Sequence, residues 1–140
     1  ASAAVAAGLI PIICLGEQIK ERKSGKTYDV IGMQFRQSLA GLTPETVSHI
    51  ILAYEPMWAI GTGMTATPQI AQEVHAYLRE LTTEMFNPSA SDNVRLLYGG
   101  SVKPENINSL MVEKDIDGVL VGGASLKVES FSKIINFEIP

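Results

Sequence analysis

With 140 residues and a mass of 15.1 kDa, the chain has the size of one ordinary domain that can bury a real hydrophobic core. Its 46% apolar and 19% charged residues exclude a disordered tail and a coiled coil. Eleven basic against fifteen acidic residues give a net charge of −4 without a basic cluster. We therefore expect no nucleic-acid partner and no membrane partner.

The chain opens on an alanine-rich stretch, residues 1–8, which reads as the last turns of a helix. Because residue 1 is Ala rather than Met, we expect a fragment or a processed chain. Four apolar runs then predict β-strands, at residues 9–15, 50–54, 94–98 and 118–121. They are nearly continuous, as expected of parallel strands covered on both faces. Pro11 should lie where no ladder hydrogen bond needs its missing N–H.

Helical patterns separate the strands. Apolar residues recur at helical spacing over residues 28–40 and 68–86, a short helix is expected over 104–111, and a last one over 127–137. Thr67 can cap the second of these helices, and Pro68 suits its first turn.

The strict alternation of strands and helices predicts an α/β fold with a parallel sheet and helical crossovers. A (β/α)8 barrel takes roughly 250 residues, so four βα units in residues 1–140 make about half of one, a partial barrel domain without a linker. A small doubly wound sheet of four strands is the alternative.

Candidate functional residues follow the carboxyl end of each strand, the edge that carries the active site in α/β folds. Glu55 directly follows the run IILAY, so its carboxylate should stand at the mouth of the sheet among apolar neighbours. Such surroundings suit a general base. The alternative is a solvated loop glutamate or a helix cap.

A long segment from Pro56 to Ala66 follows Glu55 and contains Gly61, Thr62 and Gly63. Connections in α/β units usually have about two to six residues, so the excess length beside a possible base indicates a lid over substrate. A flexible surface turn would also explain the glycines. Trp58 and Ile60 argue against it, because a solvated turn has little use for them.

Two glycine pairs follow the third and fourth strands, Gly99-Gly100 before Ser101 and Gly122-Gly123. Glycines let the backbone approach a ligand, and free N–H groups near a helix start bind anions. One pair alone is more often a turn. Two pairs in consecutive units predict a phosphate site.

The two histidines are expected to be structural or surface residues. His49 precedes a strand at the far end of the sheet, and His75 lies in a helix beside the buried position Val74. Cys14, the single cysteine, is expected to be a packed and inert thiol. It cannot form an internal disulfide, and the chain start does not resemble a signal peptide, which favours a cytoplasmic location. We expect no metal site and no nucleotide cofactor.

Four segments closely resemble the triosephosphate isomerase family: PIICLGE (11–17), AYEPMWAIGTGMTAT (53–67), LYGGSVKPEN (97–106) and DGVLVGGASL (117–126). The similarity covers essentially the whole chain and implies strands five to eight of a (β/α)8 TIM barrel. It implies cofactor-free interconversion of glycerone phosphate and glyceraldehyde 3-phosphate, in glycolysis and gluconeogenesis.

The resemblance also implies roles for single residues. Glu55 matches the base that moves a proton between two carbons through an enediol. Gly61, Ser101 and Gly123 match residues whose backbone N–H groups hold the substrate phosphate, with Gly122 beside them. Tyr98 and Ser101 match residues that latch the lid, residues 56–66.

The sequence departs from the family pattern in two ways. Met57 and Met64 replace a common Val and a common Lys of the lid, which affects lid kinetics. The family's electrophilic His and its Lys belong to units upstream of Ala1, as does most of its homodimer interface. We therefore expect the chain alone to be inactive. The alternatives are a non-catalytic half-barrel that binds phosphate or assembles with another half, and another phosphate-handling barrel.

Overall fold

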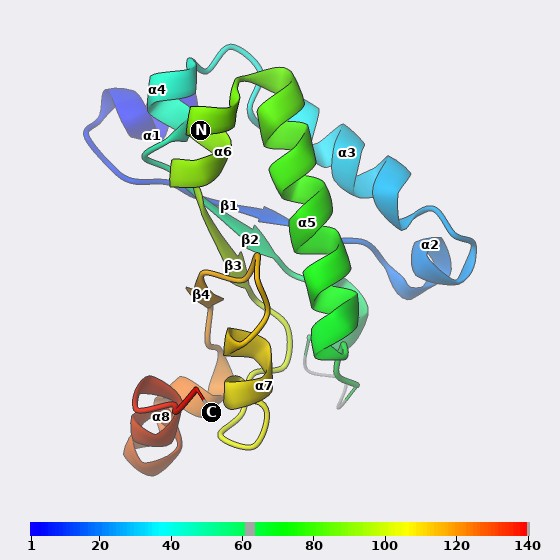
Figure 1. Ribbon diagram of the computed structural model, residues 1–140, viewed down its shortest axis with the longest axis vertical. Helices are drawn as coiled ribbons and strands as arrows, with labels where there is room; N and C mark the ends of the chain where they lie inside the picture. Colours follow the sequence, from blue (N-terminus) through cyan, green and yellow to red (C-terminus); the bar gives the residue numbers. More distant parts are fainter. Residues whose placement is uncertain (61–63, 140) are drawn as a thin grey trace.

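The computed structural model describes residues 1–60 and 64–139, and it contains one sheet of four parallel strands. The strands are β1 (Ile12–Leu15), β2 (Ile51–Tyr54), β3 (Arg95–Tyr98) and β4 (Gly118–Val119), and they lie in the order of the sequence (Figure 1). This order, with a crossover between each pair, is that of consecutive barrel strands. The sheet confirms the predicted α/β architecture.

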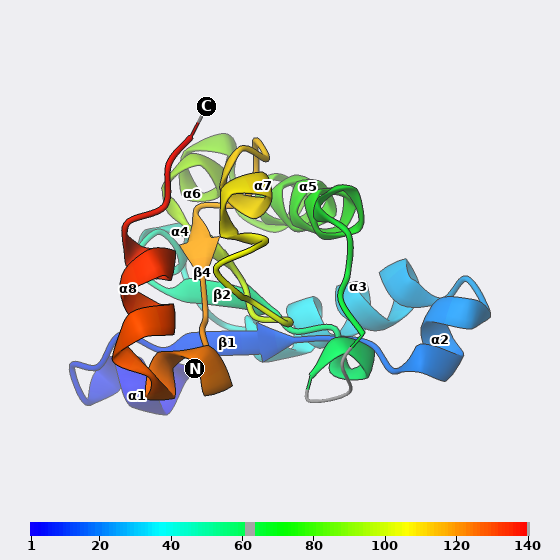
Figure 2. The ribbon, with the colours of Figure 1, turned by 90° about the horizontal axis from the view of Figure 1, so that it is seen from below.

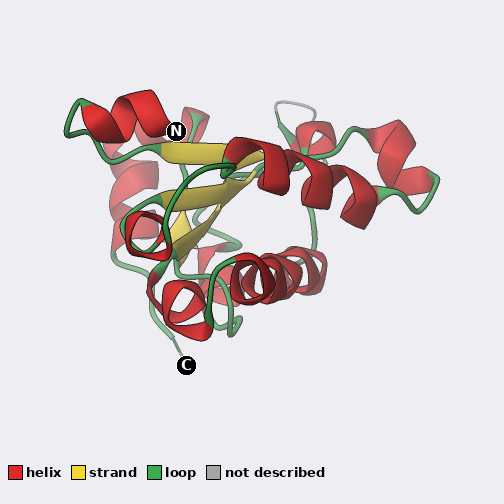
Figure 3. Cartoon of the chain, turned by 90° about the horizontal axis from the view of Figure 1, so that it is seen from above, coloured by secondary structure: helices red, strands yellow, loops and turns green. Residues whose placement is uncertain are grey.

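Helices fill the crossovers. They are α1 (Ser2–Ala6), α2 (Ile19–Lys23), α3 (Thr27–Ser38), α4 (Pro44–Val47), α5 (Pro68–Met85), α6 (Pro88–Asn93), α7 (Ile107–Met111) and α8 (Val128–Ile135), with short 3-10 helices η1 (Met57–Ala59) and η2 (Gly123–Leu126). The strands lie in the middle, with α3 and α5 packed on β1 and β2 and against each other (Figure 3). Helices α2 and α8 lie at distant ends of the molecule (Figure 2).

The core lies between the sheet and these helices. Alternate side chains of β2 and β3, namely Leu52, Tyr54, Leu96 and Tyr98, are fully buried there. The opposite face is open at β1, where Ile12 is 45% exposed. The prediction of strands covered on both faces is therefore wrong for β1, because among the described residues no element packs over that side of it.

The helix start signals explain which connections become helical. The Thr67 hydroxyl accepts a hydrogen bond from the Ile70 N–H at 3.2 Å, and Pro68 takes the first turn, as predicted. The same pattern starts α4, capped by Thr43, and α6, capped by Asn87, two helices that the sequence analysis did not predict. A cap followed by proline is their signal in the sequence.

Some predicted bounds were too wide. Strand β1 begins at Ile12 rather than residue 9, with Pro11 just outside it, where the Pro11 carbonyl accepts from the Ile51 N–H at 3.1 Å. Leu9 is exposed. Helix α7 begins at Ile107, three residues later than its proline suggested, and β4 has two residues instead of four.

Arg79, on α5, ties the outer helices to the sheet. Its guanidinium donates to the Val94 carbonyl at 2.7 Å, to the Ser91 carbonyl and to Asp117 Oδ2 at 2.6 Å. The same Asp117 oxygen accepts from the Leu96 N–H at 2.6 Å. A side-chain carboxylate thus takes part in joining β3 to β4.

Candidate active site

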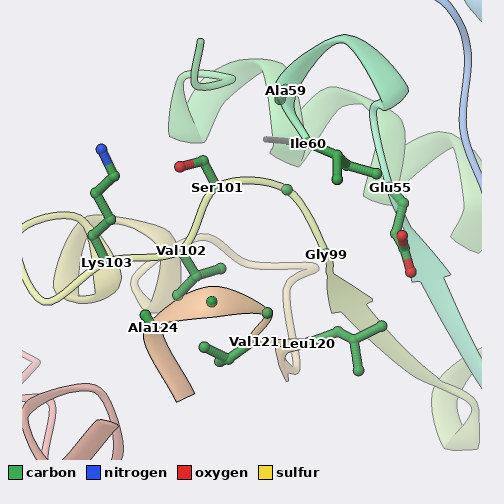
Figure 4. Close-up of a pocket in the computed structure, with 13 residues that line it drawn as sticks. Glu55, Ala59, Ile60, Gly99, Ser101, Val102, Lys103, Leu120, Val121 and Ala124 are labelled. Carbon is green, nitrogen blue, oxygen red and sulfur yellow. The ribbon is translucent and has the colours of Figure 1, made fainter. Parts of the chain in front are cut away.

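A cavity of about 440 Å³ opens at the carboxyl ends of β2, β3 and β4 (Figure 4). Each of the three strands contributes the residues that directly follow it. They are Glu55, Ala59 and Ile60 after β2, residues 99–103 after β3, and residues 120–124 after β4. The cavity therefore lies at the sheet edge where the sequence analysis placed the site.

Glu55 is held at the mouth of the sheet by its neighbours on both sides. Its backbone N–H donates to the Leu15 carbonyl at 2.7 Å, which continues the pairing of β1 with β2. A Cβ on Gly16 would collide with the Glu55 carbonyl, and a Cβ on Gly99 would lie 2.5 Å from Glu55 Cγ. The two glycines leave the space that the backbone and the side chain of Glu55 occupy.

Ser101, Gly122 and Gly123 line the same cavity as Glu55. Apart from the chain neighbours, no atom of the described residues lies within 4 Å of an ideal Cβ at Gly122 or Gly123, so packing against the described part of the chain does not explain why these residues are glycines. A ligand that approaches the backbone would explain it. The prediction that both glycine loops meet at one site is supported by this geometry.

Asn106 and Lys103 are residues of this loop to which the sequence analysis gave no role. The Asn106 amide donates to the Ser101 carbonyl at 2.8 Å, and its oxygen accepts from the Lys103 N–H at 2.8 Å. Asn106 therefore fixes the loop that carries Ser101. Lys103 lines the cavity with its stem, and its ammonium points away from Glu55 (Figure 4).

The segment after Glu55 is anchored on Glu17, which with Gly16 was a candidate at the end of the first predicted strand but received no specific role. Glu17 is fully buried, and its Oε1 accepts from Trp58 Nε1 at 3.0 Å and from the Tyr54 hydroxyl at 3.1 Å. Burial, and then the Glu17 carboxylate, raise the pKa of Tyr54, so that its hydroxyl remains a donor. The position of Glu17 directly after a strand and a glycine was its only signal in the sequence.

The predicted lid residues differ in their surroundings. Pro56 and Ala66 are buried, Ile60 is 48% exposed and lines the cavity, and Trp58 packs against the core. Gly61, Thr62 and Gly63 lie outside the described residues. Met57 and Met64, the two departures from the family pattern, are both exposed.

Tyr98, the predicted latch residue, is buried below the cavity. A Cβ on Gly100 would collide with the Tyr98 hydroxyl, so Gly100 provides the room for it. Burial raises the pKa of Tyr98, and the nearby Ala66 backbone N–H partly offsets this. Tyr98 therefore lies beside Ala66, the last residue of the predicted lid.

His75 is a structural residue and His49 a surface residue, in line with the expectation. His75 is fully buried, with its ring against Tyr54 and Tyr98, and its Nδ1 lies 2.7 Å from the Ala71 carbonyl. Burial lowers the pKa of His75. His49 is exposed before β2, at the opposite end of the sheet from the cavity.

Cys14 corrects one expectation, because its side chain is exposed on the open face of β1 rather than packed. Partial burial of the sulfur, and then the Glu55 carboxylate, raise the pKa of Cys14 to about 11. The thiol is therefore protonated at neutral pH, and low reactivity is still expected.

Within residues 1–60 and 64–139, no group of three or more His, Cys, Asp or Glu side chains could hold a metal ion. No helix in the same described part of the chain is both long enough and apolar enough to cross a membrane.

The fold and the cavity define an α/β protein with a cavity at the carboxyl ends of its parallel strands, lined by Glu55 and by two glycine loops. The family model for triosephosphate isomerase matches residues 1–138, and the chain belongs to this family.

Curated relatives named triosephosphate isomerase agree with this assignment. The chain is 56% identical over 137 residues to the protein of Pelobacter propionicus, covering 98% of this chain and 55% of the relative. It is 53% identical over 136 residues to that of Trichlorobacter lovleyi, covering 97% and 54%. For Endomicrobium trichonymphae the identity is 53% over 135 residues, covering 96% and 54%. The chain spans about half the length of these relatives, which fits a partial (β/α)8 barrel.

Proposed function

We propose that the chain supplies strands five to eight of a triosephosphate isomerase barrel, which interconverts glycerone phosphate and D-glyceraldehyde 3-phosphate. One observation carries the proposal: Glu55 lies in the same cavity as Ser101, Gly122 and Gly123. A carboxylate at one end of a cavity and exposed backbone at the other suit a substrate with an acidic C–H and a phosphate.

In this reaction Glu55 acts as the base. Its carboxylate takes a proton from the carbon beside the substrate carbonyl, which leaves an enediolate. One proton passes from the neighbouring hydroxyl to the former carbonyl oxygen through the enediol stage, and Glu55 returns its own proton to the neighbouring carbon. No electron or atom is lost, so the step needs no cofactor. The electrophilic His and the Lys that the family uses belong to the remaining half of the barrel.

We assign the phosphate end of the cavity to Ser101, Gly122 and Gly123, and the lid to residues 56–66. Gly61, which the family resemblance adds to the phosphate site, lies outside the described residues. Two contacts support this assignment. Ile60, from the lid segment, lines the cavity together with Ser101, and Ala66, at the end of that segment, lies beside Tyr98. Closure would exclude water from the enediol.

For the complete protein we propose a cytoplasmic homodimer that binds a phosphorylated triose and neither nucleic acid nor membrane. The acidic composition supports the absence of polyanionic partners. Membership of the family supports the homodimer. Analytical ultracentrifugation of the complete protein measures the assembly.

The first experiment replaces the aligned part of the Pelobacter propionicus relative by residues 1–138, which gives a chimera of full barrel length. In it, Glu55→Asp withdraws the carboxylate by about 1 Å, and kcat should fall about 100-fold. The dissociation constant of glycerol 3-phosphate, measured by calorimetry, should change less than about threefold, because the phosphate contacts remain.

The matched control is Glu84→Asp, at an exposed position of α5, which should leave both constants unchanged. Equal losses of kcat and of glycerol 3-phosphate affinity in Glu55→Asp would contradict the base assignment. An inactive parent chimera that still binds glycerol 3-phosphate would favour the alternative, a non-catalytic phosphate-binding half-barrel.

A further inference from the structure

Arg22, on the short helix α2, contacts both partners of the anchor that follows Glu55. Its Nη1 lies 3.3 Å from Glu17 Oε1, and its guanidinium carbon lies 5.4 Å from the centre of the Trp58 ring. We refer to Glu17, Arg22 and Trp58 as the hinge cluster. Three separate segments of the chain meet in it.

Arg22 compensates the buried charge of the cluster. Glu17 is fully buried, and Arg22 is the cation with which it forms an ion pair in the described part of the chain. Removing one partner of a buried ion pair leaves an uncompensated charge, which disturbs the groups bound to it. Trp58 and Tyr54 donate to the same Glu17 oxygen that pairs with Arg22. The positions of both aromatic side chains therefore depend on Arg22 through Glu17.

Arg22 also covers the Trp58 ring directly. A guanidinium over an indole face is attracted by the ring, and its planar shape stacks where a lysine ammonium does not. The Arg22 side chain is only 24% exposed, so this contact is partly shielded from solvent. Trp58 is thereby held at its Nε1 by Glu17 and at its face by Arg22.

The hinge cluster fixes the chain immediately after Glu55. The Met57 N–H donates to the Glu17 carbonyl at 3.1 Å, next to the side-chain contact of Trp58. Backbone and side chain of this turn are therefore both attached to Glu17. The position of the Glu55 carboxylate and the start of the lid segment follow from where this turn lies.

We propose that Arg22 is a positioning residue of the isomerase reaction, which holds Trp58 and Glu17 so that the turn after Glu55 keeps the base aligned. This inference rests on the proposed function. Its competitor is a purely structural role, since Arg22 also lies beside Tyr28 and Glu73 at a hollow of about 190 Å³. The two roles differ in what they do to the chemical step.

The test uses the same chimera with Arg22→Met, Arg22→Lys and the control Lys23→Met, an exposed residue of the same helix. Arg22→Met should lower kcat per active site about tenfold and change KM less than about twofold, because misplacing the base affects the reaction more than phosphate binding. Arg22→Lys keeps the charge and should recover part of the loss. A lower melting temperature with unchanged kcat per active site would overturn the proposal.

A double-mutant cycle shows whether Arg22 acts through the ring. If Arg22 acts through the Trp58 ring, adding Arg22→Met to the Trp58→Leu variant should lower kcat less than about twofold relative to Trp58→Leu alone. A full further tenfold loss would overturn the action through Trp58.

A last measurement separates this inference from the proposed function. Trp58 is the single tryptophan of the 140 residues, so in a chimera whose other tryptophans are phenylalanine its fluorescence reports on the hinge cluster. Acrylamide should quench Arg22→Met more strongly than the parent and Lys23→Met, and equal quenching would overturn the inference. If the parent chimera is inactive but the quenching differs as expected, the proposed isomerase function is refuted while the contact between Arg22 and Trp58 is supported.

Discussion

Glycine at positions 16 and 99 is explained by what lies against each residue rather than by backbone freedom. Gly16 faces the carbonyl of Glu55, and Gly99 faces its side chain. A backbone neighbour cannot move without shifting the strand, whereas a glutamate side chain can turn aside. The same substitution should therefore affect the reaction at Gly99 and the stability of the fold at Gly16.

In the chimera, Gly99→Ala should lower kcat about 10- to 100-fold, because the new methyl group turns the Glu55 carboxylate away from its position. Gly16→Ala should instead lower the free energy of unfolding by about 1–3 kcal/mol, because its neighbour is backbone. Steady-state kinetics and urea unfolding measure the two effects. Wild-type kcat in Gly99→Ala would contradict the described placement of Glu55.

Cys14 provides a chemical probe of the Glu55 charge. Partial burial and the Glu55 carboxylate raise the pKa of Cys14 to about 11, so the thiolate is rare at pH 8. In the 140-residue chain, Glu55→Gln removes the second cause and should speed alkylation by iodoacetamide several-fold at pH 8. Partial burial of the Cys14 sulfur remains in this variant, so its alkylation rate should stay below that of the chain unfolded in guanidinium chloride. A rate unchanged by Glu55→Gln would mean that the carboxylate does not act on the thiol.

At the residue scale, the sequence was enough to predict which residues lie at the carboxyl edge of the sheet. Glu55 follows β2 directly, and Ser101, Gly122 and Gly123 follow β3 and β4 within a few residues, so the parallel order places them at one edge. Arg22 and Asn106 could not be found in this way, because their contacts arise from helices and loops that turn back on the site. The exposure of Cys14 depends on which elements cover β1.

At the element scale, α5 carries the buried histidine of the fold. Burial lowers the pKa of His75 relative to the unfolded chain, which therefore takes up a proton at a higher pH than the folded protein does. The stability that neutral His75 contributes is complete above the unfolded pKa of about 6.5. It is lost as the pH falls below that value, by at most about 1.4 kcal/mol per pH unit.

Urea unfolding of the chimera between pH 7.5 and 5.5 tests this behaviour. His75→Gln should reduce the decrease in the free energy of unfolding toward low pH. His49→Gln, at an exposed site, should leave the decrease as it is in the parent. If both variants keep the same slope as the parent, His75 is not the group that titrates.

The elements with strong local signals were predicted well. Helix α5 has a cap, a proline in its first turn and a long apolar stripe, and it was predicted to within one residue. Helices α4 and α6 were missed because they are short and have few apolar positions. Strand β4 ends early although its apolar run continues, because strand length depends on pairing with β3 rather than on composition.

At the scale of the whole molecule, the described sheet has two open edges, at β1 and at β4. Large apolar side chains are exposed on β1, with Ile12 at 45%, and on α8, the helix that comes after β4 in the chain, with Val128 at 85%. Unpaired edges and apolar surface favour association with other chains. The remaining half of a barrel would cover both.

The isolated 140-residue chain should therefore associate, and light scattering after size exclusion should give a mass above 15.1 kDa. Ile12→Lys, on the open face, should reduce the association, because a charge there opposes burial. Met33→Lys, on α3 and also exposed, should not. A single species of monomer mass for the parent chain would show that the open sheet is self-sufficient.

The short strand β4 also has a consequence for the order in which the site forms. Glu55 follows β2, which is paired on both sides, whereas Gly122 and Gly123 follow a strand of two residues that is paired on one side and clipped by Asp117. Strands with few hydrogen bonds open locally at low free-energy cost. The Glu55 end of the cavity is therefore expected to form before the Gly122–Gly123 end, which we propose binds phosphate. In the proposed isomerase, closure of the barrel would complete the phosphate site, so a half-assembled protein is expected to position Glu55 without retaining a phosphorylated triose.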